Sequence, residues 1–335
     1  MIEIVDPYRR LRASCGRAGW TGNYAQNLRF CARGAGRPDD PHRGGGSDLS
    51  ALPGGASWHW TCAVCGRHTD VVEVERGVYG SLPYAAVGDG PPLVVFAGLM
   101  PVTGVGGDVV VNSALHPLLP LAASRRLVLF NRRAGLPRGM TIAELAGEHA
   151  EALRDAFAPP VDLVGTSTGG SIAAQLSADH GELVGRLALI SAACRLGPVG
   201  KALQAQVAAS IRRGAYRRAA AIAAAGLVPP LRGKAVAAAV GWMLARRLVR
   251  GPEQWADMAT TIEAEDGFDL ASCPVPITAP TLIVAGRDDR FYSAALFGQT
   301  AQLIAGSHLH LISGRGHITV TRDRSFTPAV AAFFT

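Results

Sequence analysis

Residues 161–170, with the sequence VDLVGTSTGG, constrain the fold of this chain more than any other segment. A short apolar run meets a turn in which Ser167 has a glycine two positions to either side, and a run of small, helix-compatible residues follows. So sharp a turn strains the backbone at the serine, and its neighbours can carry no bulk where strand and helix cross. The segment therefore predicts a strand, a tight turn that presents the Ser167 hydroxyl, and a helix.

A serine hydroxyl presented in this way needs a general base, and the base needs an acid that orients it. Downstream, an apolar run at 280–286 ends in glycine, and Asp288 and Asp289 follow closely. A short strand predicted at 308–312 is followed, after a glycine-rich turn, by His317. Both candidates stand where a strand has just ended, in the order serine, acid, histidine.

These motifs make residues from about 71 to 335, roughly four fifths of the chain, resemble the α/β-hydrolase superfamily. The motifs are Gly-x-Ser-x-Gly at 165–169, Gly-x-x-Asp at 286–289 and Gly-x-Gly-His at 314–317. The resemblance implies an α/β fold, with a mostly parallel sheet, helices on both of its faces and an inserted helical cap.

The resemblance also implies a catalytic triad, with Ser167 as nucleophile, His317 as general base and Asp289 as acid. In the family the acid usually lies three residues past the glycine that ends its strand, which favours Asp289 over Asp288. The alternative for Asp288 is a solvated loop charge or a turn cap. A structural role is expected for five other histidines, at His116, His149, His180, His308 and His310.

A further resemblance concerns the oxyanion hole. The strand predicted at 93–96 runs into Ala97-Gly98, where the family usually has His-Gly. The family's histidine is structural and the donor is a backbone N–H, so Ala97 need not abolish catalysis. By resemblance the donors are the amides of Leu99 and Thr168. The alternative is that Gly98 merely ends a core strand.

The family implies acyl transfer to water on a small-molecule acyl substrate: a carboxylic ester, a lactone or a thioester. No metal or organic cofactor is expected for this chemistry. The same fold hosts C–C bond hydrolases, acyltransferases and cofactor-free haloperoxidases, so the fold alone does not choose among them. An alternative from another class is a ligand receptor that keeps the triad but turns over slowly or once.

The order of the predicted elements supports a parallel sheet. Closely spaced strands at 71–75, 82–87 and 93–96 suit an antiparallel entry into the sheet. The alternation of helices and strands that follows indicates a parallel sheet with helices on both faces. It comprises a helix at 113–123, a strand at 126–130, a helix at 141–157, the strand before Ser167 and a strand at 186–190. The expected parts are a leader (1–70), the first part of the core (71–192), a helical cap (193–277) and the second part of the core (278–335).

The expected cap has an unusual charge distribution. Residues 183–252 contain twelve Lys and Arg and no Asp or Glu, although the whole chain carries a net charge of only +7. A solvated helix face is one interpretation, and a field that steers an anionic substrate toward Ser167 is another. Nucleic-acid binding is not expected, because no stacking face or known motif accompanies the charge. Firm attachment to a membrane surface is not expected either, because the apolar residues there are mostly alanine.

The first seventy residues do not share the pattern of the core. Residues 33–53 are rich in Gly, Pro, Arg and Asp without periodicity, which predicts a disordered or weakly structured leader. Cys62 and Cys65 could form one half of a zinc site, and His59 and His68 could complete its four ligands. The alternative is a leader without a role.

Composition bounds the remaining possibilities. No apolar stretch is long enough to span a membrane, and the first residues lack the basic and apolar regions of a signal peptide. The six cysteines are irregularly spaced and do not resemble a disulfide framework. A cytoplasmic protein with free thiols is therefore expected.

Overall fold

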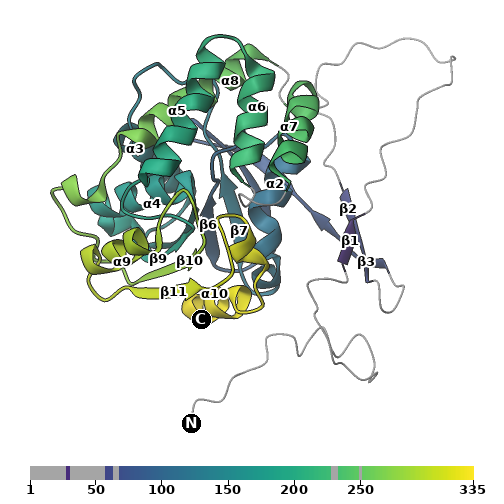
Figure 1. Ribbon diagram of the computed structural model, residues 1–335. Helices are drawn as coiled ribbons and strands as arrows, with labels where there is room; N and C mark the ends of the chain where they lie inside the picture. The colour runs from purple at the N-terminus through teal and green to yellow at the C-terminus, as the bar shows by residue number, and fades with distance from the viewer. Residues whose placement is uncertain (1–27, 31–56, 63–67, 228–232, 249–250) are drawn as a thin grey trace, which may run out of the picture. The chain divides into compact units, whose positions relative to one another are not determined.

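The computed structural model describes residues 28–30, 57–62, 68–227, 233–248 and 251–335 (Figure 1). The chain divides into two compact units, Met1–Val74 and Glu75–Thr335. The first unit contains an antiparallel sheet of three strands in the order β1-β2-β3. These strands are β1 (Leu28–Phe30), β2 (Ser57–Cys62) and β3 (His68–Glu73).

The sequence did not lead us to expect β1 and β2, and it predicted only the last residues of β3, within the strand expected at 71–75. Two tryptophans alternate along β2, at Trp58 and Trp60, and aromatic residues favour strands. Two predictions concern residues outside those described: the disorder of 33–53, and zinc binding by Cys65 together with Cys62. Both stay predictions.

The second unit is built on an eight-stranded sheet in the order β11-β10-β9-β8-β6-β7-β5-β4. The strands from β7 to β11 in this order run parallel to one another, whereas β5 is antiparallel to both β4 and β7. The predicted α/β fold with a mostly parallel sheet is therefore confirmed. The strands are β4 (Glu75–Tyr79), β5 (Leu82–Val87), β6 (Pro92–Phe96), β7 (Arg126–Phe130), β8 (Val161–Thr166), β9 (Val184–Ile190), β10 (Thr281–Gly286) and β11 (His308–Ile312).

Two details of the sheet differ from the expectation. The strand predicted at 71–75 is divided between two elements, because β3 ends at Glu73 and β4 begins at Glu75 in the other unit. The antiparallel entry is also shorter than expected. β6 lies between β7 and β8 and is parallel to both, so only β4 and β5 form the antiparallel part.

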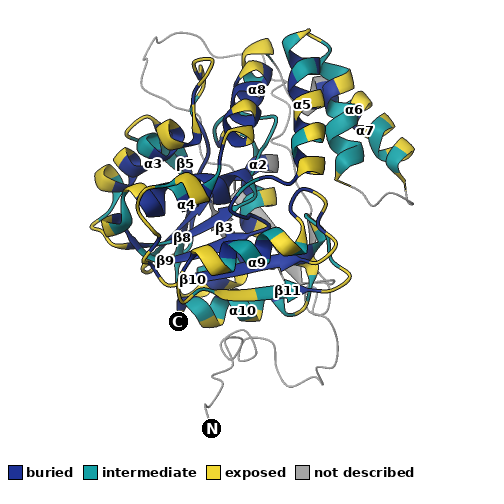
Figure 2. Ribbon diagram, turned by 60° about the vertical axis from the view of Figure 1, so that its left-hand side comes forward, coloured by how far each residue is buried: buried dark blue, intermediate teal, exposed yellow. Residues whose placement is uncertain are grey.

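Helices cover both faces of the sheet, and its central strands are accordingly buried runs of apolar residues (Figure 2). The segment expected as one helix at 113–123 begins earlier and changes type, because Pro117 and Pro120 lack the N–H that an α-helix needs. The helices of the core are α2 (Asp108–Leu115), η2 (His116–Ala123), α3 (Ile142–Ala156), α4 (Thr168–Asp179), η3 (Gly181–Leu183), α9 (Ala294–Leu303), η5 (Thr319–Arg322) and α10 (Phe326–Phe334).

The segment expected as a cap consists of helices joined by turns and loops, with no strand among its described residues. It contains α5 (Pro198–Arg212), α6 (Tyr216–Gly226), α7 (Lys234–Leu248), α8 (Pro252–Asp266) and the short η4 (Leu270–Ser272). Helix α5 packs against both α6 and α8, and α6 packs against α7. Apolar side chains of these helices form a separate small core, which includes Val207, Ile211, Trp255, Met258 and Ile262.

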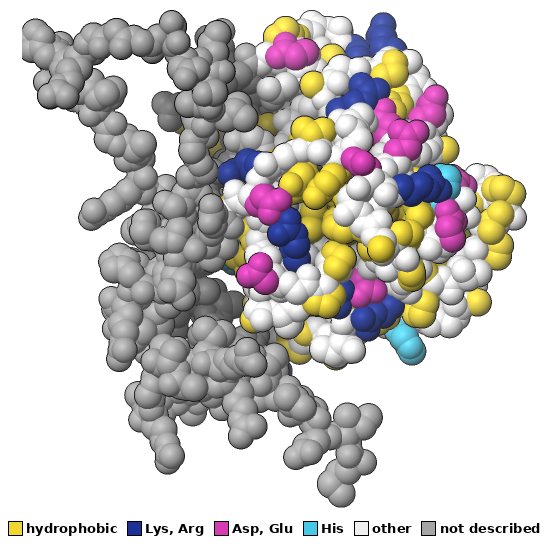
Figure 3. Space-filling model, turned by 180° about the vertical axis from the view of Figure 1, so that it is seen from behind, with side chains coloured by type: hydrophobic (Ala, Val, Ile, Leu, Met, Phe, Trp, Pro, Cys, Tyr) yellow, Lys and Arg dark blue, Asp and Glu magenta, His cyan; other side chains and the backbone are white. Residues whose placement is uncertain are grey.

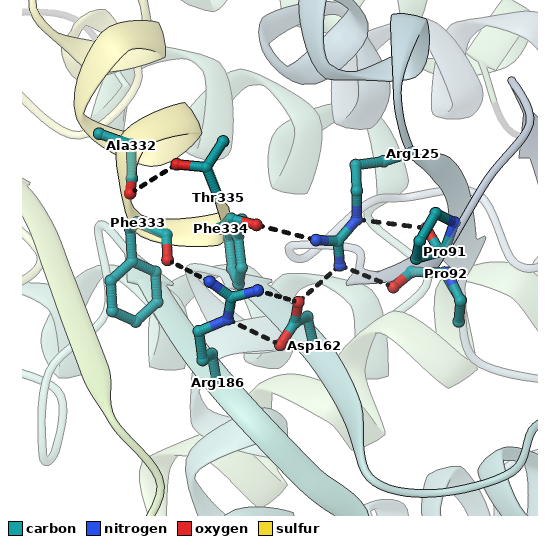
Figure 4. Close-up of polar contacts among 9 residues, drawn as sticks. All are labelled: Pro91, Pro92, Arg125, Asp162, Arg186, Ala332, Phe333, Phe334 and Thr335. Carbon is teal, nitrogen blue, oxygen red and sulfur yellow. Dashed lines mark hydrogen bonds and ion pairs between the residues drawn. The ribbon is translucent and has the colours of Figure 1, made fainter. Parts of the chain in front are cut away.

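The amino-terminal end of the sheet is held by an ion-pair network around Asp162 of β8 (Figure 4). Its carboxylate pairs with Arg125 at 2.5 Å and with Arg186 at 3.1 Å. The same guanidinium groups donate hydrogen bonds to the carbonyl oxygens of Phe334 and Phe333 in α10. This network fixes the C-terminal helix at the end of the sheet opposite to the turn that follows β8.

On the face of the second unit shown in Figure 3, acidic and basic side chains are interspersed among apolar ones. No helix within the described ranges is both long enough and apolar enough to cross a bilayer.

Candidate active site

Ser167 occupies a strained turn between β8 and α4. Its φ of 53° and ψ of −124° lie outside the regions that a residue with a side chain usually adopts. A side chain at Gly165 would place its Cβ 2.6 Å from the carbonyl oxygen of Gly169. One at Gly169 would overlap the carbonyl oxygens of Phe96 and Ala97. Both glycines are therefore needed for the close packing of strand, turn and helix, as the motif predicts.

A chain of hydrogen bonds leads from this serine to a buried carboxylate. Ser167 Oγ lies 2.9 Å from His317 Nε2, and His317 Nδ1 lies 2.8 Å from Asp289 Oδ2. A carboxylate can only accept hydrogen bonds, so Nδ1 carries the proton and Nε2 is left to accept from the hydroxyl. The other oxygen of Asp289 accepts from the backbone N–H groups of Phe291 and Tyr292. This arrangement fixes the tautomer that a general base requires.

The loops after β10 and β11 bring the acid and the histidine together. The backbone N–H of Asp288 donates to the carbonyl oxygen of Arg315 at 2.9 Å, and a Cβ at Gly286 would overlap that oxygen. The side chain of Asp289 is fully buried against His317, whereas Asp288 is exposed. The structure therefore places Asp289, and not its neighbour, in contact with the imidazole.

None of the five histidines expected to be structural contacts Ser167 in this way. Within the described residues, the histidine that hydrogen-bonds Ser167 is His317. His149 is buried, with Nδ1 2.7 Å from the carbonyl oxygen of Leu145, and its ring meets that of Phe96 edge-on. Burial lowers the pKa of His149 to about 4. His149 is therefore neutral at pH 7.

The two amides expected to bind an oxyanion lie close to Ser167. A Cβ at Gly98 would be 3.5 Å from Ser167 Cβ, so the turn after β6 passes directly beside the serine. Leu99 follows in this turn, and Thr168 is the first residue of α4. In the described part of the chain neither N–H donates to another group. The positive end of the α4 dipole also favours negative charge here.

Two residues that sequence reasoning missed hold this turn from the end of β7. Asn131 Nδ2 donates to the carbonyl oxygens of Val102 (3.1 Å) and Gly104 (2.8 Å). The buried Arg132 donates to the carbonyl oxygen of Met100. Desolvation lowers the pKa of this guanidinium to about 10, so it remains charged at pH 7. The segment that follows the candidate oxyanion donor is thereby anchored at several points.

Sequence reasoning also missed a hydrogen-bond network around Glu265 of α8, whose exposed fraction is 0%. Its carboxylate accepts hydrogen bonds from the hydroxyls of Thr168 (2.7 Å), Ser171 (3.1 Å) and Tyr292 (2.9 Å). It also accepts one from Gln204 Nε2 at 3.0 Å. Burial and this carboxylate raise the pKa of Tyr292 well above its usual value. One buried acid thus joins the helix after Ser167, the loop of Asp289 and two cap helices.

Ser191, at the end of β9, is another positioning residue that the sequence did not reveal. It has a positive φ of 47°, and its Oγ donates to the carbonyl oxygen of His317 at 2.8 Å. The ring of Phe291 lies 4.5 Å from the imidazole ring, centre to centre. The only local signal for Ser191 is its place directly after a predicted strand.

The core and the cap together enclose a cavity of about 250 Å³ that Ser167 and His317 line. Its remaining wall is apolar apart from Gln204, and none of the lining residues is a lysine or arginine. A neighbouring hollow of about 220 Å³ contains Lys234 and Arg290 in its wall. Among the described residues, no three His, Cys, Asp or Glu side chains are arranged to bind a metal ion.

No family model matches this chain. Several solved structures are similar to it over most of their length. An enol-lactonase from Burkholderia xenovorans LB400 is 22% identical, over 78% of this chain and 99% of that chain, with a TM-score of 0.62. A hydrolase from Pseudomonas aeruginosa PA01 is 22% identical, over 78% and 98%, with a TM-score of 0.61. A thermophilic esterase from Thermogutta terrifontis is 16% identical, over 78% and 98%, with a TM-score of 0.58.

These likenesses agree with the mostly parallel, eight-stranded sheet and the helices that cover it. At such low identities they bear on the fold. The chain has the α/β-hydrolase fold.

Proposed function

We propose that this chain is a serine hydrolase that cleaves a small carboxylic ester, lactone or thioester through a covalent acyl-enzyme. The hydrogen-bond chain from Ser167 through His317 to Asp289, at the wall of a largely apolar cavity, carries the proposal. An enol-lactonase and an esterase stand among the proteins of similar fold, which supports this class of reaction.

In the proposed mechanism Ser167 Oγ attacks the carbonyl carbon while His317 Nε2 takes the hydroxyl proton. His317 then delivers that proton to the leaving group, and Asp289 stabilises the imidazolium. Water repeats the sequence on the acyl-enzyme and releases the acid. The amides of Leu99 and Thr168 hold the oxyanion, and the loss of one such donor typically costs about 2.7–4 kcal/mol of transition-state stabilisation.

The cavity bears on the substrate. Its apolar wall suits an acyl group without charge, and Gln204 is the one polar wall residue besides Ser167 and His317. An anionic group on the substrate would find cations in the neighbouring hollow, at Lys234 and Arg290. We therefore propose an apolar acyl group in the cavity, with any carboxylate directed toward these two side chains.

Stopped-flow measurement of p-nitrophenol release from a series of p-nitrophenyl esters of increasing acyl length tests the proposal. An enzyme with an acyl intermediate gives a burst equal to the concentration of active sites, followed by steady turnover. A ligand receptor with the same triad gives the burst without the turnover. If no ester of the series gives either a burst or turnover, the proposed hydrolysis is refuted.

A further inference from the structure

The outer side of α7 carries large apolar side chains that are open to solvent. Val236, Val240 and Met243 are 67%, 46% and 67% exposed, and Trp242 is 47% exposed. At 3.6 residues per turn, the first three lie within about 60° of one another around the helix axis. They form a single stripe along the helix. In Figure 2 the ribbon of α7 is coloured mostly as intermediate and exposed residues.

This gathering of apolar residues is not a general property of the surface. The four residues of α7 are among eleven large apolar side chains that are exposed in the described residues, so more than a third of these lie on one helix. Leu227, after the end of α6, is also exposed but lines the cavity that contains Ser167. Single exposed apolar residues are normal, whereas a contiguous group marks an interaction surface.

The opposite side of α7 faces inward. Gly241 and Ala245 are buried there and line the cavity that contains Ser167. A Cβ at Gly241 would come within 2.7 Å of Ala224 on α6, so the two helices are closely packed. Small residues therefore occupy the inner side of α7, while Val236, Val240 and Met243 lie on its exposed side. The sequence-based objection that its apolar face is mostly alanine does not hold for the outer side.

Positive charge accompanies the stripe. The guanidinium of Arg217 lies over the ring of Trp242 at 4.2 Å. No acidic residue occurs between positions 183 and 252. Three basic side chains at the end of α5 and in α6 form no ion pair within the described ranges, and they are Arg213, Arg217 and Arg218.

We propose that the outer face of α6 and α7 docks on an anionic lipid surface. Val236, Val240 and Met243 enter the boundary between headgroups and acyl chains, and the three basic side chains lie against the headgroups. An aliphatic stripe has no counterpart in a nucleic acid, which stacks on aromatic side chains. A second copy of the chain would bring the same positive charge against this face, which disfavours self-association. The docking does not depend on hydrolysis.

Co-sedimentation of the full-length Ser167→Ala protein with vesicles tests the proposal without any contribution from catalysis. The vesicles contain phosphatidylcholine alone or phosphatidylcholine with an equal amount of phosphatidylglycerol. We expect binding to the mixed vesicles, with little binding to the neutral ones, and a loss of binding at high salt. Equal binding to the two kinds of vesicle, or none to either, would overturn the proposal.

Two sets of variants separate the stripe from the charge. Val236→Ser, Val240→Ser and Met243→Ser together should lower the partition onto mixed vesicles at least tenfold. Each glutamine placed at Arg213, Arg217 or Arg218 should lower it about fivefold. Val275→Ser with Leu303→Ser, which alters exposed apolar residues elsewhere, is the matched control and should bind like the parent.

Circular dichroism and gel filtration accompany each variant. If the triple serine variant does not fold, the glutamine variants test the proposal alone, because they alter only exposed or half-buried charges. Unchanged partition in the folded variants would contradict lipid docking. A parent protein that is dimeric, with a monomeric triple variant and no vesicle binding, would show that the stripe is an interface between copies instead.

Discussion

The two halves of the cap differ in how they are held to the core. Helix α8 carries two buried acids, Asp257 and Glu265, on its inner side. Asp257 accepts hydrogen bonds from the backbone N–H groups of Gly135 and Leu136 and from the hydroxyl of Thr103. Glu265 binds the helix that follows Ser167. This half is therefore joined by hydrogen bonds to the loops that surround the triad.

The other half, α6 and α7, has no comparable attachment among the residues that the structure describes. The contact between its two helices is made by glycine and alanine, such as Gly241 against Ala220 and Ala224, and such small side chains bury little apolar area. Toward α8 the half is held by the stacked rings of Tyr216 and Trp255. The two halves therefore differ in how they are attached: buried acids join α8 to the loops around Ser167, whereas α6 and α7 are held by apolar contacts.

The largest expected effect on the catalytic side follows from replacing the acid that contacts His317. Asp289→Asn should lower kcat/KM by about four orders of magnitude, because an amide at this position favours the wrong tautomer of His317. Asp288→Asn is the matched control, since Asp288 is exposed and lies one residue away. Steady-state kinetics on a p-nitrophenyl ester measures both, and a larger loss in the Asp288 variant would refute the assignment of the acid.

The attachment of α8 is tested by Glu265→Leu. This change leaves four buried donors without their acceptor, and after rearrangement of the hydroxyls we expect a loss of about 3–5 kcal/mol in the free energy of unfolding. Glu263→Leu on the same helix removes only a partly exposed ion pair with Arg212, and it should cost less than about 1 kcal/mol. Urea denaturation gives both values. Equal losses would mean that Glu265 does not anchor the helix.

A smaller effect is expected from His149, which packs beneath the strand that leads to the oxyanion turn. Its pKa is about 4 in the folded protein, below the usual value of 6.5 for histidine, because burial disfavours the charged form. Its contribution to stability is therefore complete above pH 6.5 and is lost as pH falls toward 4. Across this window we expect a loss of about 3 kcal/mol.

The control for this pH dependence is His149→Gln, which cannot titrate. The difference in unfolding free energy between parent and variant, measured by urea denaturation from pH 7 to pH 4, should shrink as the pH falls. A difference that stays constant over this range would show that His149 does not contribute to the acid sensitivity of the core.

The smallest expected effect concerns the charge on α6 and α7. If this charge steers substrates, a carboxylated ester should have a several-fold higher kcat/KM than its neutral analogue at low salt. The advantage should vanish at about 1 M salt, where the Debye length is about 3 Å. Replacing Arg213, Arg217 and Arg218 by glutamine should reduce it without affecting the neutral ester. Equal rates on the two esters at low salt would end the steering hypothesis.

Much of the fold could be predicted because strands leave local patterns: β5 and β7 are mostly buried apolar runs, whereas β11 alternates histidine with leucine at the edge of the sheet. The strands at 82–87, 126–130 and 308–312 were predicted at their observed bounds. The division at Val74 and the insertion of β6 beside β8 could not be predicted, because pairing between strands depends on residues far apart in the chain. Local patterns do not carry that information.

The candidate site shows the same limit. Ser167, Asp289 and His317 could be found because each stands where a predicted strand ends. Glu265 could not, because it lies within a cap helix and its partner Thr168 is 97 residues away. Its role emerges only once α8 is docked on the helix after the serine. The three candidate catalytic residues leave a local signal in the sequence, whereas the residues that hold them in place do not.

The central claim is that Ser167 is the nucleophile of an acyl-transfer reaction. Incubation of the full-length protein with a fluorophosphonate, followed by intact-mass analysis and peptide mapping, tests it most directly. We predict one adduct for each chain, located on Ser167, and none on the Ser167→Ala protein. Labelling that persists in the Ser167→Ala protein, or an unlabelled parent protein that still hydrolyses p-nitrophenyl esters, would contradict the claim.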